Sequence, residues 1–238
     1  MAQISAEAGV DWAAARVITD DTDRGIRQFE WAHDGHHLLY LQDIGGDENW
    51  RLHNVGVHTM ARRDPTPFDG MQTQITGLER NRPDEVLLGL NKANPELHEA
   101  YRLDLPSGEL AKEIDNPGFI AWVNDTELIV RGAVAPQLDG SFTLLVRDDT
   151  DSEWRELLAI PAEDAESLNV VGFSPDGHSL LITSSVGAQT SRVVGVDAAT
   201  GATEVLAEDW QDTLYERLVF PVHWLAAELT GRRTDTSA

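Results

Sequence analysis

Residues 31–55 read WAHDGHHLLYLQDIGGDENWRLHNV, and they describe a tight turn, a strand, a loop and a second strand. The Asp-Gly pair at residues 34–35 is typical of a turn between strands. The run His37–Gln42 is rich in Leu and Tyr, which favours a strand. Its predicted partner is Trp50–Val57, where Trp50 and Leu52 fall on one face by two-residue alternation. The stretch therefore predicts a pair of adjacent strands.

The same order of residues returns near the end of the chain. Residues 173–181 read FSPDGHSLL where residues 31–39 read WAHDGHHLL, and weaker copies lie between them. Steps of 47, 44 and 51 residues separate the markers of the copies, which are Trp31, Leu78, Trp122 and Phe173. Four short strands per copy at this period are typical of propeller blades. The sequence predicts an all-β fold, a partial or truncated β-propeller of about four to five four-stranded antiparallel blades.

Turn residues and prolines divide the chain into segments. Residues 1–23 form an N-terminal lead-in whose secondary structure the sequence leaves open. The predicted blades cover residues 24–69, 70–115, 116–162 and 163–209, a fifth blade begins at 210–220, and residues 221–238 form a divergent C-terminal tail with a helical pattern at 223–229. A closed propeller needs a complete last blade. A truncated protein, a small ring and an open arc with exposed edges therefore all stay open.

The composition describes an acidic globular protein. The chain has 238 residues, a net charge of −23 and only two lysines, Lys92 and Lys112. Such a surface repels nucleic acid and anionic membranes, because their phosphates need cationic partners. The absence of cysteine excludes disulfides and thiolate metal sites. No apolar run of about 18 residues occurs. We expect a cytoplasmic protein with no nucleic-acid partner, no membrane partner and no cofactor.

One cluster of residues imitates a metal site. His33, Asp34, His36 and His37 are residue types that bind zinc. The last copy keeps the turn DGH at residues 176–178 without the other histidines. Turn formation therefore explains the cluster, and we predict no metal.

A second segment imitates a catalytic motif. Residues 172–177, GFSPDG, approach the nucleophile elbow G-x-S-x-G but lack its second glycine. Ser174 also begins a strand-to-strand turn, whereas the elbow joins a strand to a helix. No other serine lies between glycines at that spacing, and neither His178 nor His223 has an evident serine to activate. We predict no catalytic residue in this chain.

The loop DIGGDEN is the most distinctive polar segment of the chain. Its oxygen-bearing residues are Asp43, Asp47, Glu48 and Asn49. Calcium accepts such ligands, but their spacing does not match the twelve-residue calcium loop. Turn formation by Asp and Asn, with two glycines in unusual backbone conformations, explains the segment. The alternative function is to line a channel or to dock a partner domain.

Arg131 is a further candidate for a channel. It lies late in a predicted inner strand. There its guanidinium could hold a substrate carboxylate near a propeller axis. The alternative is an ordinary surface arginine among many acids.

Five strings carry a family resemblance: LLYLQDIGGDENWRLHNV (38–55), TPFDGMQTQITGL (66–78), RPDEVLLGLN (82–91), HEAYRLDLPSGEL (98–110) and NPGF (116–119). With them the sequence resembles the N-terminal propeller region of the prolyl oligopeptidase family, in the branch of acylaminoacyl-peptidase and dipeptidyl-aminopeptidase type. The similarity covers about residues 16–206. It implies a propeller that precedes an α/β-hydrolase domain with a Ser-Asp-His triad and admits only short peptides.

The chain departs from that family pattern in three respects. Its 238 residues contain no nucleophile elbow, the blade pattern stops after about four and a half copies, and the segment from Val222 no longer resembles the family. We therefore expect a non-catalytic, substrate-gating propeller portion of a serine peptidase, inactive alone, whose partner is an α/β-hydrolase domain or chain. The alternative is a stand-alone module that binds a peptide or a second copy through exposed strand edges. A metal-dependent propeller hydrolase is a third hypothesis.

Overall fold

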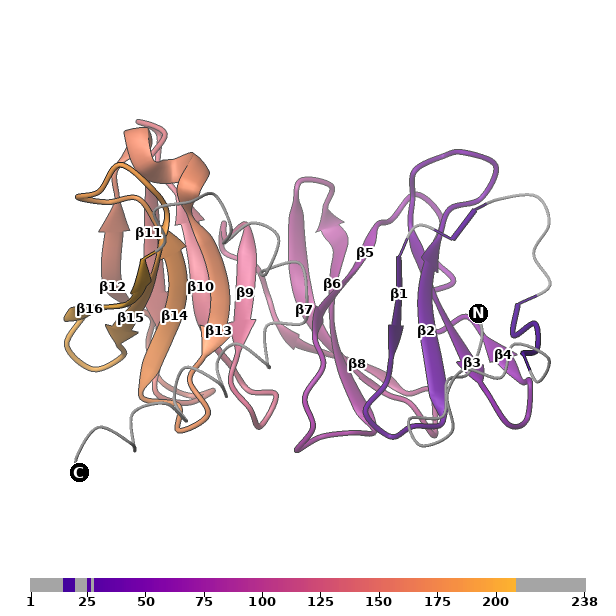
Figure 1. The fold of residues 1–238 in the computed structure, drawn as a ribbon. Helices are drawn as coiled ribbons and strands as arrows, with labels where there is room; N and C mark the ends of the chain where they lie inside the picture. Colours follow the sequence, from indigo (N-terminus) through magenta and orange to yellow (C-terminus); the bar gives the residue numbers. More distant parts are fainter. Residues whose placement is uncertain (1–14, 20–24, 27, 209–238) are drawn as a thin grey trace, which may run out of the picture. The chain divides into compact units, whose positions relative to one another are not determined.

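The computed structural model describes residues 15–19, 25, 26 and 28–208. Figure 1 shows the described chain as strands joined by turns and loops. The strands form sheets of four. Blade 1 contains β1 (Gln28–Trp31), β2 (His37–Gln42), β3 (Arg51–Gly56) and β4 (Arg62–Arg63), and blade 2 contains β5 (Thr73–Gly77), β6 (Glu85–Asn94), β7 (Leu97–Asp104) and β8 (Leu110–Ile114).

The second half of the described chain repeats this arrangement. Blade 3 contains β9 (Ala121–Asn124), β10 (Val130–Pro136), β11 (Phe142–Val146) and β12 (Arg155–Ile160), and blade 4 contains β13 (Asn169–Phe173), β14 (Ser179–Ser184), β15 (Arg192–Asp197) and β16 (Thr203–Glu208). A short 3-10 helix, η2 (Ala162–Ser167), joins the two blades.

Every blade has the same topology, in which consecutive strands are antiparallel neighbours. Such up-and-down sheets of four strands are the blades of a propeller. The prediction of an all-β, propeller-type fold with four-stranded antiparallel blades is confirmed. Within the described part of the chain, no helix has the length and apolar character needed to cross a bilayer.

The chain divides into two compact units, the first ending at Asp115 and the second beginning at Asn116. In unit 1 the core lies between blades 1 and 2. Leu39 and Leu52 of blade 1 and Leu88 and Leu103 of blade 2 have no exposed surface. Full burial of one such side chain contributes about 1.5–3 kcal/mol. The second face of blade 1 is also apolar, and there Ile18 and Ile26 pack with the buried residues Leu38, Tyr40, Val55 and Val57.

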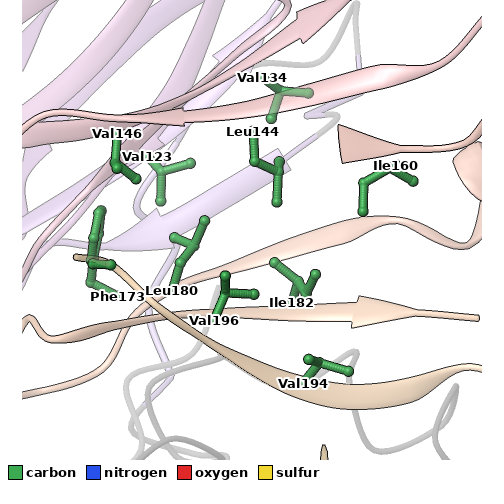
Figure 2. Close-up of a cluster of buried hydrophobic side chains, with 11 residues drawn as sticks. Val123, Val134, Leu144, Val146, Ile160, Phe173, Leu180, Ile182, Val194 and Val196 are labelled. Carbon is green, nitrogen blue, oxygen red and sulfur yellow. The ribbon is translucent and has the colours of Figure 1, made fainter. Parts of the chain in front are cut away.

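Unit 2 has an equivalent core between blades 3 and 4. Figure 2 shows the side chains of both blades pointing into the space between their sheets. Val134, Leu144 and Val146 come from blade 3, and Leu180 and Val196 come from blade 4. These residues alternate with residues of the opposite face along each strand, as a sheet covered on one side requires.

Local contacts move two element boundaries away from the sequence-based prediction. The residue pattern favours a loop at 91–97, but β6 and β7 extend into this segment and pair again at Asn94 and Leu97, after an irregularity that follows Leu90. The residue pattern also favours a strand at 127–132, whereas β10 begins only at Val130. Asp125 causes this delay, since its carboxylate accepts hydrogen bonds from the backbone N–H groups of Glu127 (2.9 Å) and Ile129 (3.0 Å) and holds a turn.

Several predictions concern residues that the structure does not describe. The fifth-blade start at 210–220 and the tail at 221–238 lie outside the described residues, as does most of the lead-in at 1–23. The two prolines in residues 62–69 favour a connection between blades there, but the first two residues of this segment form the strand β4. Its pairing with Asn54 and Val55 gives blade 1 a fourth strand.

Candidate functional site

The histidine-rich turn of blade 1 is organised by Asp34. Its carboxylate accepts hydrogen bonds from the backbone N–H groups of His36 (2.7 Å) and His37 (3.0 Å) and lies 2.5 Å from the His37 ring. Burial raises the pKa of Asp34, but these hydrogen bonds outweigh it, so that the pKa is below its ordinary value. The residue therefore shapes the turn. In the described ranges, no three His, Cys, Asp or Glu side chains gather as metal ligands would.

The equivalent turn of blade 4 contains Ser174. Its hydroxyl donates a hydrogen bond to the Asp176 carboxylate (2.6 Å) and accepts one from the Ser179 backbone N–H (3.0 Å). Only 6% of Ser174 is exposed. A nucleophilic serine needs its hydroxyl bonded to a base and open to substrate. These contacts give Ser174 a role in the turn.

The loop between β2 and β3 is held together by Asp47. The Asp47 carboxylate accepts hydrogen bonds from the backbone N–H groups of Ile44 (3.3 Å) and Asn49 (3.1 Å) and from the Asn49 side chain (3.2 Å). These bonds from Asn49 are the main reason that the pKa of Asp47 is lowered. The buried Asp43 accepts a further, longer bond of 3.4 Å from the Glu48 backbone N–H. The loop is thus stabilised from within.

Backbone conformation and exposure define what the loop presents to solvent. Gly45 and Gly46 have φ values of 63° and 86°, and Glu48 has a φ of 57°, which is uncommon for a residue with a side chain. Asp47 and Glu48 are exposed, and 56% of the Ile44 surface is accessible. The loop therefore offers one aliphatic side chain beside acidic ones.

Blade 2 supports the loop through side-chain amides that no sequence motif marks. Gln72 donates from its side chain to the Glu48 carbonyl (3.1 Å), and its backbone N–H donates to the Asn91 side chain (2.7 Å). Asn91 in turn donates to the Pro95 carbonyl (3.0 Å). No spacing in the sequence pairs Gln72 with Glu48, because these two residues meet only when blades 1 and 2 pack. The one feature of the sequence that could have indicated these contacts is Asn91, a polar residue that follows an apolar run.

Lysine and aromatic residues also meet in unit 1. The Lys92 ammonium lies 4.6 Å from the centre of the Phe68 ring, a distance at which a cation is attracted to the ring face. Lys92 follows Asn91 directly and is exposed, and it is one of only two lysines in the chain. Its positive charge therefore lies beside the half-buried Phe68 ring.

Arg131 belongs to unit 2, and the residues that it contacts in the following description also belong to unit 2. Its guanidinium lies over the Phe173 ring, 4.8 Å from the ring centre. It also lies 3.5 Å from the Asp125 carboxylate and donates to the Gly177 carbonyl at 3.3 Å. These contacts join blades 3 and 4. A role for Arg131 in a channel stays a prediction.

The chain is similar in sequence to known peptidases. It is 33% identical over 196 residues to dipeptidyl aminopeptidase BIII of Pseudoxanthomonas mexicana, and the match covers 82% of this chain. The chain spans only 28% of the length of that relative. No family model matches the sequence.

Solved structures show the same fold at low sequence identity. A puromycin-hydrolyzing peptidase of Mycobacterium tuberculosis superposes with a TM-score of 0.57 at 14% identity, over 87% of this chain and 32% of that one. TolB of Acinetobacter baumannii superposes with a TM-score of 0.52 at 15% identity, over 79% of this chain and 45% of that one. The fold therefore occurs in proteins called peptidases and in a protein called TolB, so that fold alone does not decide function.

Proposed function

Because this chain is homologous to the propeller region of the prolyl oligopeptidase family, we propose that it is the non-catalytic, substrate-gating part of a serine peptidase. The peptide-cleaving chemistry belongs to an α/β-hydrolase domain or chain that works with it. The propeller limits which substrates reach that domain and favours short peptides over long ones.

The similarity to the Pseudoxanthomonas mexicana aminopeptidase carries this proposal. The match covers 82% of a chain whose described residues are mainly blades and connecting turns. The serine that best imitates a nucleophile, Ser174, is bonded to Asp176 in a turn and is almost fully buried. Both facts support the proposal that this chain is a part of a peptidase and has no nucleophile of its own.

We place the contact with the hydrolase domain at the loop 43–49. Its internal bonds to Asp47 and its brace from Gln72 give it a fixed shape, which lowers the entropy lost on docking. Ile44 supplies exposed apolar surface, and the acidic side chains beside it suit a partner surface with positive charge.

The absence of a nucleophile is tested with a fluorophosphonate probe, which labels activated serines. We expect the purified 238-residue chain to remain unlabelled and to leave dipeptidyl and acyl-peptide nitroanilides intact, since Ser174 is held in its turn. A relative with peptidase activity serves as the positive control. Labelling of this chain that disappears in Ser174→Ala would contradict the proposal.

A further inference from the structure

The first strand of blade 1 differs from the first strands of the other blades. All four residues of β1 are exposed, whereas β5, β9 and β13 each contain at least one buried residue. Two of the exposed residues are aromatic, with 49% of Phe29 and 36% of Trp31 accessible. At the corresponding markers of blades 3 and 4, Trp122 and Phe173 are only 8% and 7% exposed. The aromatic side chains of β1 are therefore more exposed than the aromatic side chains at the equivalent positions of blades 3 and 4.

The backbone of β1 has an open edge. Within the described sheet β1 pairs only with β2. The Ala32 backbone N–H donates to the His37 carbonyl (3.0 Å), which makes Ala32 and His37 a hydrogen-bonded pair. Such pairs alternate along an antiparallel ladder, so the backbone groups of Phe29 and Trp31 point away from β2. The two exposed aromatic residues therefore also present donors and acceptors at the open edge.

Side-chain alternation gives the two faces of β1 different chemistry. Phe29 lies opposite Tyr40 and Trp31 lies opposite Leu38, so both aromatic side chains extend the apolar face that contains these buried residues. Glu30, between them, projects to the other face and is exposed. The edge thus combines an apolar face with one negative charge.

We propose that the open edge of β1 binds an extended peptide segment as an additional antiparallel strand. The segment has apolar residues opposite Phe29 and Trp31 and a basic residue opposite Glu30. Main-chain hydrogen bonds supply affinity in this mode of recognition, and alternate side chains supply specificity. Opposite charges directly across a strand pair are stabilising, which favours a basic residue over an acidic one.

The same charge disfavours a second copy of this chain as the occupant. An antiparallel pair of β1 strands that aligns Phe29 with the Trp31 of the other copy also sets Glu30 opposite Glu30. Like charges directly across from each other are destabilising. The proposal goes beyond gating and does not depend on it, because it concerns the described residues of blade 1 alone.

Three acetylated and amidated pentapeptides test the proposal by calorimetry with the full chain. The first is Val-Lys-Val-Lys-Val, the second carries N-methyl groups on its valines, and the third carries them on its lysines. In the proposed register the valine N–H groups donate to β1, while the lysine N–H groups point outward. We expect methylation of the valines to abolish binding and methylation of the lysines to leave it within about threefold, since only the former removes hydrogen bonds.

Variants at the edge complete the test. We expect Trp31→Ser to abolish binding of Val-Lys-Val-Lys-Val, and Ile120→Ser, a change at a residue 53% exposed in unit 2, to leave it unchanged. Glu30→Lys reverses the preference, so that Val-Glu-Val-Glu-Val binds more tightly than the lysine peptide. Equal loss from both methylated peptides, unchanged binding by Trp31→Ser, or no binding at millimolar peptide would overturn the proposal. A dimer in sedimentation velocity that Trp31→Ser dissolves would overturn it in favour of self-association.

Discussion

Leu144→Ala is expected to lower the free energy of unfolding of unit 2 by about 2–5 kcal/mol. Leu144 has no exposed surface and lies in the core between blades 3 and 4 (Figure 2). It is paired across the sheet with Val134 on one side and Leu158 on the other. Shortening this side chain removes buried apolar surface and leaves a cavity that neighbouring strands cannot fill. Urea unfolding followed by circular dichroism measures the loss.

Leu138→Ala is the matched control for this change. The same side chain is removed at a fully exposed position in the turn between β10 and β11. A surface change of this kind alters stability by less than about 0.5 kcal/mol. If both variants unfold at the same urea concentration, the packing of blade 3 on blade 4 is not what stabilises this unit.

Gly201→Ala is expected to destabilise the chain by about 2–4 kcal/mol, since backbone strain and overpacking add. Gly201 has a φ of 73° at the end of the turn that begins at Asp197. A Cβ atom added there would lie 2.6 Å from the Leu157 carbonyl oxygen of blade 3. That oxygen belongs to the backbone and cannot rotate away as a side chain could. The steric clash is therefore removed only if the two blades move apart.

Gly108→Ala separates the cost of backbone strain from the cost of overpacking. Gly108 ends the equivalent turn of blade 2, where its N–H donates to the Asp104 carbonyl (2.8 Å) and its φ is 77°. Its added Cβ would meet only the Arg63 side chain, at 3.6 Å. We expect this variant to lose about 1–2 kcal/mol from strain alone. Equal thermal unfolding temperatures for the two variants would mean that the close approach of Gly201 to Leu157 does not occur.

The turns show what a sequence can predict. Asp34 and Asp176 were expected to shape equivalent turns, and each accepts backbone hydrogen bonds two residues further along. The similar turns that end at Gly108 and Gly201 contain the short sequences P-S-G (106–108) and A-T-G (199–201). These features are local, since one side chain and the next few backbone groups determine them.

Features that depend on two blades could not be predicted in the same way. The brace from Gln72 to the Glu48 carbonyl crosses 24 residues and exists only because blades 1 and 2 pack. The contact of Arg131 with the Phe173 ring spans 173 − 131 = 42 residues of sequence, and the register of β9 and β10 shifts beside Arg131, between Val130 and Gly132. The sequence could identify the loop 43–49 and Arg131 as polar candidates for a functional site. Their contacts follow from tertiary packing.

A chimera makes the gating proposal testable. In it, this chain replaces the 196-residue matching part of the Pseudoxanthomonas mexicana aminopeptidase. Ile44→Asp in the chimera tests the docking loop, because it places a charge on the exposed apolar residue. Glu96→Ala, in the neighbouring turn between β6 and β7, is its control. We expect only the first change to loosen the gate and to increase cleavage of long substrates.

The most direct measurement is the ratio of kcat/KM for a dipeptidyl nitroanilide to kcat/KM for an unfolded protein of about 100 residues. A propeller that gates a hydrolase domain predicts a folded chimera that cleaves the nitroanilide and discriminates against the long chain by at least about a hundredfold, which corresponds to about 2.7 kcal/mol in transition-state free energy. A folded, active chimera that cleaves both substrates with the same kcat/KM would contradict the proposed function.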